Sequence, residues 1–531
     1  MIGGTVALCI LNEGNNSVTS TSGNLFAGAA RDARSFSSRV WVVALLFFAT
    51  ATLLYTRQNE FPFTYHPNES GKVEQVLEGE RNFRHPLLLV NTTALAAWLR
   101  GADRSPQAVA LVGRNCSAIF AALAVSALAW LAYRQAGLTA TICAGLIVML
   151  HPQIFELAHY MKEDTALLAG LALFLLALDC FWRRRSRGTA LALGAASGLA
   201  ASGKYLGASA VLVGLAFVLW PKPQEGRWAG LPRSGFFLLG CLACLLVINW
   251  QGWAHPASWN AGLQDEFDVL FPELHHPASL RAFRVLRELV FPGVWVLLAL
   301  HVFHCSRHRT QTSAPQWLLL AWPFLYVAAL AVMGRETTRY FLPAVVLINF
   351  QAGLGLAETA TQLSSGWRMR RPILPFLGLI ALGLALVLPN QSMRLAQTLA
   401  AFSTDHRKDL VRYLNDSVPG PAVIVAEWRS GLQSQTSITP RHAVMSRAFA
   451  DEVGTIEEMR RGGVTHVVVG EDNYRKYFGR RWVSSPTGAE AASKRRAFYR
   501  QLFAEGHLVF ERKRQTVSVL NPGLRLYQIA R

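Results

Sequence analysis

The chain has 531 residues, of which 52% are hydrophobic and 16% are charged, and its mean hydropathy is +0.25. These values are typical of a protein that crosses a membrane several times, and they exclude a purely soluble one. The net charge of +19 does not indicate a nucleic-acid partner, because the arginines concentrate in short connectors between apolar runs, where membrane proteins carry them on the cytoplasmic side.

Residues 1–38 are rich in Gly, Ser, Thr and Asn, and Arg31 and Arg34 precede the first long apolar run. We expect a disordered cytoplasmic tail that these arginines keep inside. No small-residue cleavage site follows the run at 40–55, so this run is interpreted as a retained anchor rather than a removable signal.

Apolar runs of bilayer-spanning length recur between residues 39 and 390, which predicts a transmembrane domain over this range. At roughly 17 to 25 residues per span, we expect about eleven helices. They are placed at 40–56, 108–133, 138–155, 165–182, 189–203, 205–220, 235–250, 288–305, 316–333, 340–357 and 373–390. The predicted fold class is a polytopic α-helical membrane protein with a small C-terminal α/β domain.

The connectors between these runs alternate in charge. Every second one is rich in arginine, as in Arg183-Arg184-Arg185, and the positive-inside rule places such connectors in the cytoplasm. Two long connectors of mixed or acidic charge, 57–107 and 251–287, then lie outside. Because the number of spans is odd, the C-terminal domain is predicted to lie outside as well.

The cysteines do not indicate redox chemistry. Cys241 and Cys244 form a C-x-x-C pair, but they lie inside an apolar run, where a small apolar role is favoured over redox or metal chemistry. No cysteine follows Cys305, so no disulfide reveals the compartment of the distal domain.

After Asn390 the apolar runs shorten and charged residues become dense, which predicts a soluble α/β domain over 391–531. Its predicted strands are 422–426, 464–469, 508–511 and 524–529, and its predicted helices are 407–415 and 456–461. The basic stretches at 494–500 and 512–514 are interpreted as a solvated or headgroup-facing surface.

Charged side chains stand in four outer connectors at the same predicted membrane depth. They are Glu69 and Lys72, then Lys162, Glu163 and Asp164, then Lys204 with Tyr205 beside it, then Arg335 and Arg339. Isolated acids at the ends of spans are tolerated at little cost, so each alone is weak evidence. Their combination with cations indicates a reaction site.

This pairing suits the transfer of a sugar from a lipid phosphate. The acceptor hydroxyl must lose its proton as it attacks the anomeric carbon, which requires a carboxylate base within hydrogen-bond reach. The departing phosphate gains negative charge, so lysines and arginines beside it stabilise the transition state more than the ground state.

Five segments of the predicted membrane domain follow one another in an order that indicates a family resemblance. They are Tyr65-His66-Pro67-Asn68-Glu69 with Lys72, then Asn82-Phe83-Arg84-His85-Pro86-Leu87, His159-Tyr160-Met161-Lys162-Glu163-Asp164, Gly198-Leu199-Ala200-Ala201-Ser202-Gly203-Lys204-Tyr205 and Arg339-Tyr340-Phe341-Leu342-Pro343. In this order they resemble bacterial phospholipid-carrier-dependent glycosyltransferases of the GT-C superfamily, which also holds the protein O-mannosyltransferases and the lipid A aminoarabinose transferase. The distal domain fits that family in position and size, not by motif.

The resemblance implies an inverting transferase in the bacterial cytoplasmic membrane. Its implied partners are a polyprenyl-phosphate sugar, membrane lipids and an acceptor glycan, lipid or protein on the outer face. The residues expected to bind the donor are Lys72, Lys162, Lys204, Tyr205, Arg335, Arg339 and Tyr340. His66 and His85 are expected to contact substrate.

One position departs from the family pattern. In such enzymes the first loop usually reads His-Pro-Asp-Glu, and the Asp is the expected base. Here that position is Asn68, which cannot accept a proton at neutral pH. Either Glu69 or Asp164 takes the role, or the protein binds its lipid without turning it over. We assign Glu69 as the base, and Asp164, next to Glu163, as a second carboxylate that orients the acceptor or a divalent cation such as Mg²⁺ or Mn²⁺.

Simpler roles stay open for several candidates. Lys72 contacts phosphate or only pairs with Glu69, an exposed interaction of about 0.3 to 0.5 kcal/mol. Lys204 meets a lipid headgroup or snorkels. His66 and His85 each precede proline without the spacing of metal ligands, so substrate contact or a structural role is favoured over metal binding.

The second outer connector is assigned no chemistry. The acidic run from Asp265 to Asp268 is interpreted as a solvated loop, and Trp250, Trp253 and Trp259 mainly as an interfacial aromatic belt, with sugar stacking as the lesser alternative.

Two other functions compete with sugar transfer. A secondary transporter needs ionisable groups near the membrane midplane, usually on repeated halves, whereas this sequence keeps its acids at span ends and shows no internal repeat. A catalytically weakened lipid-binding, envelope-assembly or sensor protein fits Asn68 and the distal domain. It leaves the order of the other segments unexplained.

Overall fold

The computed structural model describes residues 38–221, 228, 230–270, 281–366, 373–432, 438–439, 441–478 and 486–529. Nearly all of the predicted N-terminal tail, and the histidine-rich part of the second outer connector, lie outside the described residues. The chain forms two compact units. Unit 1 comprises Met1–Asn59 and Gly71–Leu395, and unit 2 comprises Glu60–Ser70 and Ala396–Arg531.

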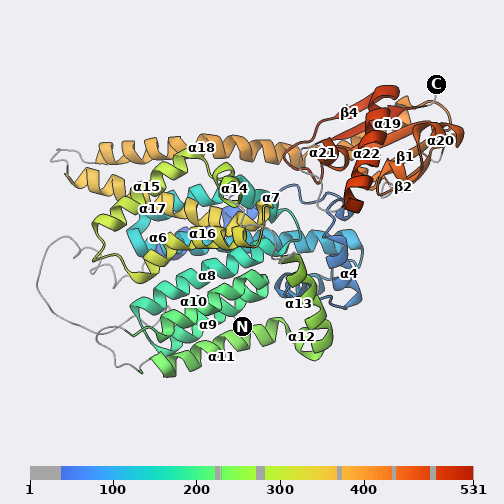
Figure 1. Ribbon diagram of the computed structural model, residues 1–531. Helices are drawn as coiled ribbons and strands as arrows, with labels where there is room; N and C mark the ends of the chain where they lie inside the picture. Colours follow the sequence, from blue (N-terminus) through green and yellow to red (C-terminus); the bar gives the residue numbers. More distant parts are fainter. Residues whose placement is uncertain are drawn as a thin grey trace, which may run out of the picture. The chain divides into compact units, whose positions relative to one another are not determined.

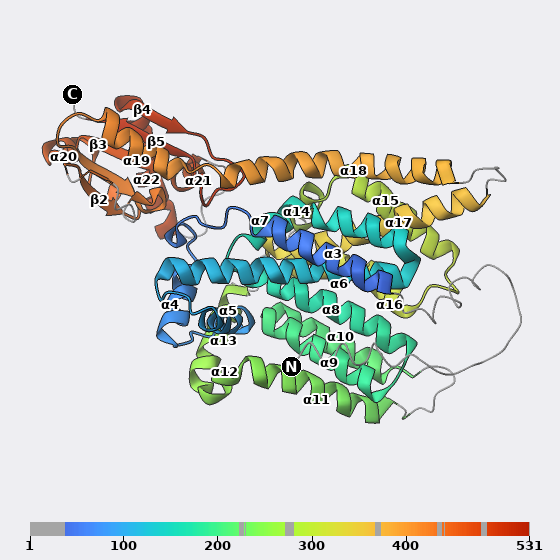
Figure 2. The same ribbon diagram turned by 180° about the vertical axis from the view of Figure 1, so that it is seen from behind.

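Unit 1 is a bundle of helices that run side by side (Figures 1 and 2). Its long helices are α3 (Ser38–Tyr55), α6 (Pro106–Met149), α8 (Glu163–Arg183), α9 (Arg187–Gly203), α10 (Ala208–Leu219), α11 (Gly230–Ile248), α15 (Pro292–Arg307), α16 (Ala314–Val332), α17 (Leu342–Gly366) and α18 (Ile373–Phe402). Helices α3, α8 and α17 all pack on α6, and α9 packs between α8 and α11.

All eleven predicted membrane ranges overlap helices of the structure. Six described helices are long and apolar enough to cross a membrane, or seven if the bent pair α14 (Arg281–Leu289) and α15 counts as one span. Two predicted ranges fall in α6, which is interrupted at Ala136 and Gly137, where Gly137 has a φ of 80°. The chain is thus a multi-pass membrane protein, and the number of eleven spans stays a prediction.

Small residues allow the helices of unit 1 to pack closely. On α9, Gly194 and Gly198 form a G-x-x-x-G pair against α11: a Cβ at Gly194 would stand 1.9 Å from the carbonyl oxygen of Phe237, and one at Gly198 would stand 2.6 Å from that of Cys241. Cys241 and Cys244 are free, buried thiols at this contact. Their role as small apolar packing residues fits the expectation from sequence.

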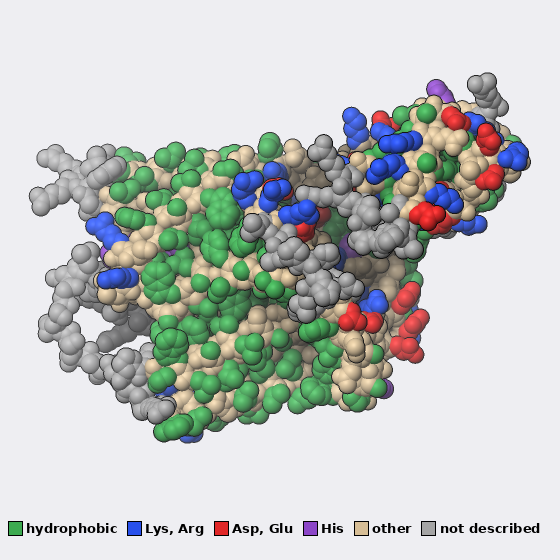
Figure 3. Space-filling view, in the orientation of Figure 1, with side chains coloured by type: hydrophobic (Ala, Val, Ile, Leu, Met, Phe, Trp, Pro, Cys, Tyr) green, Lys and Arg blue, Asp and Glu red, His purple; other side chains and the backbone are tan. Residues whose placement is uncertain are grey.

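Both long connectors of unit 1 contain helices. The first holds α4 (Ser70–Glu78) and α5 (Leu88–Leu99), and the second holds α12 (Trp250–Ala254) and α13 (Pro256–Leu270). In the space-filling view, hydrophobic side chains cover the flank of unit 1, while carboxylates gather at the end that carries α4 and α13 (Figure 3). Exposed acids there include Glu74, Glu78 and Glu80 of and after α4.

Unit 2 contains a five-stranded mixed sheet with the order β2-β1-β3-β5-β4. Its strands are β1 (Val423–Glu427), β2 (Ala443–Arg447), β3 (His466–Gly470), β4 (His507–Arg512) and β5 (Leu524–Gln528). Strand β1 pairs in parallel with β2 and β3, whereas β5 is antiparallel to both β3 and β4. The small C-terminal α/β fold expected from sequence is present.

Helices cover both faces of this sheet, because its central strands are apolar on both sides. Ile424 and Val468 face α19 (His406–Ser417), and Val425 and Val467 face α20 (Ile456–Arg461), α21 (Glu471–Phe478) and α22 (Pro486–Glu505). The four predicted strands and two predicted helices correspond to structured elements, but β2, α21 and α22 were not predicted. The edge strand β2 is only partly buried, so it lacks the apolar run that marks β1 and β3.

Candidate functional site

The centre of the site is the first turn of α8. Glu163 and Asp164 are its first residues, and Lys162 precedes the helix in extended backbone. A helix N-terminus favours negative side chains, because its free N–H groups and the helix dipole present positive charge there. All three side chains are buried, with about 5% of their surface exposed.

Two lysines from distant segments pair with these carboxylates. The Nζ atom of Lys72 lies 2.9 Å from Oε1 of Glu163, and that of Lys204 lies 2.8 Å from Oδ1 of Asp164. Lys72 therefore pairs with Glu163, a contact that neither sequence alternative anticipated. Buried ion pairs add little net stability, because desolvation opposes their attraction. Two of them side by side therefore indicate a functional site.

Close helix packing places Lys204 against Asp164. A Cβ at Gly170 of α8 would stand 2.4 Å from Cα of Ala200 on α9, and one at Gly203 would stand 2.7 Å from the backbone nitrogen of Leu167. Only glycine permits this approach, and α9 ends at Gly203, so the next residue, Lys204, reaches the first turn of α8. The apolar segment before Lys204 thus has a defined positioning role.

The protonation of the two nearest lysines differs. Burial alone would lower the pKa of Lys204, but the carboxylate of Asp164 outweighs it, so the pKa is raised and the ammonium stays charged. Burial together with the charge of Arg339 lowers the pKa of Lys162 to about 8, against the smaller opposing effect of Asp164. Lys162 therefore changes charge near neutral pH.

Tyr340 gathers three cations around its ring. The distance to the ring centroid is 4.4 Å for Nζ of Lys204, 5.2 Å for Cζ of Arg339 and 5.9 Å for Cζ of Arg335. Such contacts stabilise positive charge beside an aromatic face. Tyr340 lies in η4 (Thr338–Phe341), immediately before α17, so the segment that opens that helix completes the cluster.

The arginines of this cluster carry unused hydrogen-bond donors. Nε and Nη2 of Arg335 and Nε of Arg339 are buried atoms without a hydrogen-bond partner among the described residues. Buried donors are normally satisfied, and leaving one unsatisfied costs about 1 to 3 kcal/mol. A phosphate oxygen is a matching acceptor for guanidinium N–H groups.

His85 lies between two carboxylates. Its Nε2 atom is 4.0 Å from Oε1 of Glu163, and its Nδ1 atom is 3.8 Å from Oε2 of Glu266. The interpretation of 265–268 as a solvated loop is wrong for Glu266, which lies on α13 and is 8% exposed. Gly262, four residues earlier, is buried on the same face of α13. This i, i+4 spacing was the signal that could have identified Glu266.

Helix α13 packs tightly on the 82–85 segment. A Cβ at Gly262 would stand 2.5 Å from the carbonyl oxygen of Asn82. The ring of Trp259 stacks on Phe83 with centroids 6.4 Å apart, and the hydroxyl of Tyr205 donates to the carbonyl oxygen of Phe83 at 2.8 Å. Trp259 and Tyr205 thus hold the segment that carries His85, whereas Trp250 and Trp253 are exposed, as a membrane-interface belt requires.

The predicted base lies in the other unit. His66, Asn68 and Glu69 belong to the 60–70 segment of unit 2, where the ring of Tyr65 contacts Arg407 at 4.4 Å. The backbone N–H of Asn68 donates to Nδ1 of His66 at 3.2 Å, which gives His66 a structural role. The meeting of Glu69 with the cluster of unit 1 stays a prediction.

Within unit 1 the structure brings together most of the remaining predicted site residues. They are Lys72, His85, Lys162, Glu163, Asp164, Lys204, Arg335, Arg339 and Tyr340. Tyr205 follows Lys204 but points its hydroxyl to Phe83. Sequence reasoning missed Glu266.

A divalent cation does not fit this arrangement as it stands. Among the described residues, no group of three or more His, Cys, Asp or Glu side chains has the geometry of a metal site. Glu163 and Asp164 each face a lysine, which a cation would have to displace.

Comparisons with known proteins find resemblances to glycosyltransferases. The sequence profile described as dolichyl-phosphate-mannose-protein mannosyltransferase matches residues 85–253, which include His85, Glu163, Asp164 and Lys204. The crystal structure of ArnT from Cupriavidus metallidurans bound to undecaprenyl phosphate is 15% identical to this chain, with a TM-score of 0.50, over 92% of this chain and 98% of that one. The chain therefore resembles glycosyltransferases of the GT-C superfamily, in sequence over residues 85–253 and in fold over most of its length.

Two further solved structures match the chain with lower TM-scores. The oligosaccharyltransferase of Archaeoglobus fulgidus is 13% identical with a TM-score of 0.46, over 84% of this chain and 71% of that one. The S. cerevisiae Pmt1-Pmt2 complex bound to the sugar donor is 17% identical with a TM-score of 0.36, over 46% and 36% of the two chains. No curated protein sequence matches.

Proposed function

We propose that this protein is an inverting glycosyltransferase that moves a sugar from a polyprenyl-phosphate donor to an acceptor on the outer face of the cytoplasmic membrane. The donor class is supported by the similar ArnT structure, which is bound to undecaprenyl phosphate. The acceptor is a hydroxyl group of a glycan, lipid or protein.

The reaction is a single displacement. The acceptor oxygen attacks the anomeric carbon and forms the new glycosidic bond, while the bond from that carbon to the phosphate oxygen breaks. The acceptor proton passes to a carboxylate, and the electron pair of the broken bond leaves on polyprenyl phosphate. Lys204, Arg335 and Arg339 stabilise the negative charge that develops on this phosphate.

One observation carries the proposal: buried, unsatisfied guanidinium donors of Arg335 and Arg339 lie beside the buried Lys204–Asp164 pair, around the ring of Tyr340. An exposed ion-pair network would leave no buried donors without partners. A phosphate held here would satisfy them, with arginine in bidentate contact and lysine as a point charge.

The test uses membranes that contain the protein and a radiolabelled polyprenyl-phosphate sugar. Label should move to an acceptor fraction, and Asp164→Asn should lower this transfer about 100-fold or more, because the variant loses a charged group of the reaction centre.

Asp179→Asn is the matched control. Asp179 lies at the other end of α8, is also buried, and pairs with Arg134 at 2.7 Å and Arg183 at 3.0 Å. At equal protein level the control should retain transfer. Equal losses of transfer in Asp164→Asn and Asp179→Asn would refute the proposed site. Labelled donor that binds but never passes its sugar to an acceptor would refute the transferase and favour the lipid-binding or sensor alternative.

The base is tested separately. Glu69→Gln should lower transfer by about 10²- to 10⁴-fold, the usual contribution of a general base. Asn68→Asp restores the carboxylate that related enzymes carry, so a large gain would mean that the native chain is a weakened enzyme. Full activity of Glu69→Gln would exclude Glu69 as the base and leave Asp164 as the candidate.

A further inference from the structure

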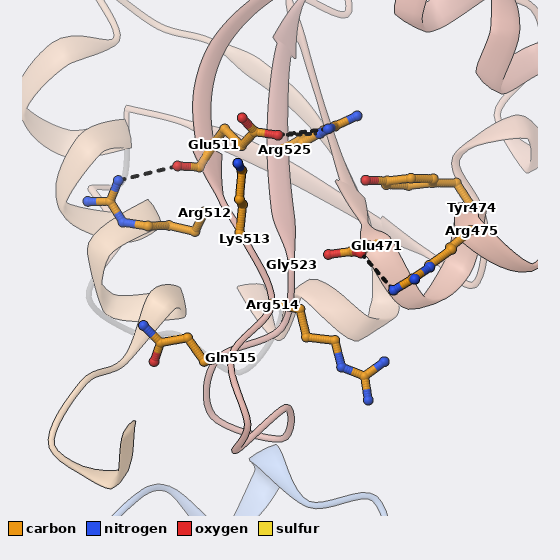
Figure 4. Close-up of a pocket in the computed structure, with 10 residues that line it drawn as sticks. All are labelled: Glu471, Tyr474, Arg475, Glu511, Arg512, Lys513, Arg514, Gln515, Gly523 and Arg525. Atoms are coloured by element: carbon orange, nitrogen blue, oxygen red, sulfur yellow. Dashed lines mark hydrogen bonds and ion pairs between the residues drawn. The ribbon is translucent and has the colours of Figure 1, made fainter. Parts of the chain in front are cut away.

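Unit 2 contains a pocket that the proposed reaction does not use. Its volume is about 400 Å³, and α21 forms one side while the end of β4 and the start of β5 form the other (Figure 4). Its lining residues are Glu471, Tyr474, Arg475, Glu511, Arg512, Lys513, Arg514, Gln515, Gly523 and Arg525. All of them belong to unit 2.

The lining is strongly basic. Five of the ten residues are Arg or Lys and two are Glu. Four of the cations have carboxylate partners: Arg525 pairs with Glu511 at 2.8 Å, Arg475 with Glu471 at 3.3 Å, Arg512 with Asp409 at 3.1 Å and Arg514 with Asp472 at 2.6 Å. Lys513 makes no ion pair or hydrogen bond with the residues that the structure describes.

These pairs are exchangeable. The side chains of Arg512 and Arg514 are 46% and 43% exposed, and exposed ion pairs contribute only about 0 to 1 kcal/mol. A dianionic phosphate offers guanidinium groups a bidentate partner with more charge than a carboxylate. The arginines can therefore turn from their carboxylates to a ligand at little cost, while Lys513 supplies an uncompensated positive charge.

A glycine shapes the wall of the pocket. A Cβ at Gly523 would stand 2.2 Å from Oε2 of Glu471, and the backbone N–H of Glu471 donates to the carbonyl oxygen of Gly523 at 2.7 Å. Any side chain at position 523 would push Glu471 away from its present place beside Arg475. The space and the placement of charge in this pocket thus depend on the absence of a side chain there.

We propose that this pocket binds the phosphate group of an anionic saccharide or lipid. The basic stretch 512–514 lines a pocket with walls on two sides and is therefore more than a basic surface (Figure 4). Binding here needs no sugar transfer, so the proposal stands or falls independently of the proposed function.

The experiment is calorimetric titration of the full-length protein, in nanodiscs of neutral phosphatidylcholine, with inorganic pyrophosphate at physiological salt. Lys513→Gln and Arg514→Gln should each weaken binding about tenfold, the value of one charge-assisted hydrogen bond. Gly523→Ala should weaken it without a change in charge, with an unchanged melting temperature as the check on folding.

Arg500→Gln is the matched control, because Arg500 is an exposed cation of α22 outside the pocket lining. It should leave pyrophosphate binding unchanged. No heat of binding in the native protein, or an equal loss in the control, overturns the proposal, since both outcomes reduce the pocket to part of a generally basic surface.

A second arm distinguishes the sources of phosphate. Glucose 1-phosphate is titrated in phosphatidylcholine nanodiscs and in nanodiscs that contain phosphatidylglycerol. Equal binding in both supports a soluble phosphorylated saccharide as the ligand. Loss of binding in the anionic nanodiscs, with binding intact in the neutral ones, supports occupation by a lipid headgroup.

Discussion

The fold brings the pKa of Lys162 close to neutral pH. Burial and the neighbouring Arg339 lower its pKa to about 8, so the ammonium is present below this pH and is lost above it. If Lys162 helps to bind the donor phosphate, the apparent affinity for the donor should fall as pH rises from 7 to 9. The measurement is the donor KM of the transfer reaction across this range.

The matched variant is Lys162→Arg, which keeps its charge at every pH used. Its donor KM should lack the step near pH 8. The pKa of Lys162 in the folded protein lies below its value in the unfolded chain, unlike that of a lysine stabilised by an ion pair. The stability contributed by this group therefore rises as pH increases above about 8, because the buried side chain loses its charge. An identical pH profile for native protein and variant would remove Lys162 from the site.

At the residue scale the sequence pointed to side chains that the structure brings together, but it did not predict their partners. Glu163 and Asp164 were identified because two acids open an apolar run after a lysine. Their partners, Lys72 and Lys204, stand 91 and 40 residues away, and no local pattern encodes such pairing. Glu266 was missed because charge density in a short run resembles a solvated loop until the helical spacing to Gly262 is considered.

At the scale of elements, the contact between α8 and α9 determines the site. Gly170→Leu should force α9 away, because a Cβ there already stands 2.4 Å from Cα of Ala200. We expect a loss of at least about 1 to 3 kcal/mol in stability, the usual cost of overpacking, and separation of Lys204 from Asp164. Thermal melting in detergent measures the first effect, and sugar transfer measures the second.

Gly378→Leu is the control for this prediction. Gly378 lies in the long helix α18, and a Cβ there meets no atom within 4 Å in the described structure. The same substitution should therefore leave melting temperature and transfer near native values. If Gly170→Leu behaves like this control, the close approach of α8 and α9 does not position the site.

Element prediction succeeded where the signals are local. Hydrophobic runs predicted the long helices, and the predicted connector between the spans 108–133 and 138–155 falls at the break inside α6. The start of α9 also has a local cause, since the Ser186 hydroxyl accepts a hydrogen bond from the backbone N–H of Thr189 and caps the helix. The bend of 101° between α14 and α15 was not predicted, although Pro292 opens α15 and Phe291 before it is in extended backbone, because the predicted span 288–305 runs across this break.

At the scale of the whole molecule, the orientation in the membrane is a prediction that accessibility can test. In a background without native cysteines, Asp103→Cys in an expected outer connector should react with a membrane-impermeant maleimide on intact cells. Arg309→Cys, in an expected inner connector, should react only after permeabilisation. Both native side chains are exposed, so burial does not limit either reaction. The reverse labelling pattern would place the proposed reaction site on the cytoplasmic side of the membrane.

The grouping of the chain into units also goes beyond local sequence. Residues 60–70 were expected to be part of the first outer loop of the membrane domain, whereas the structure groups them with the C-terminal unit. Phe61 contacts Phe402 with ring centroids 5.8 Å apart, and Tyr65 contacts Arg407. These contacts join residues more than 300 positions apart, so no pattern within the loop could predict them.

The sequence by itself determined the class of this protein, the extent of most helices and the identity of the charged residues, because composition, hydrophobic period and helix breakers act over a few turns. Only the tertiary structure decided that Lys72 and Lys204 meet Glu163 and Asp164, that Glu266 turns inward to His85, and that α21 and the β4–β5 ends enclose a basic pocket. The physical reason is the same in each case: burial and charge pairing depend on which distant segments pack together, and small residues such as Gly170, Gly203 and Gly262 set how closely they approach.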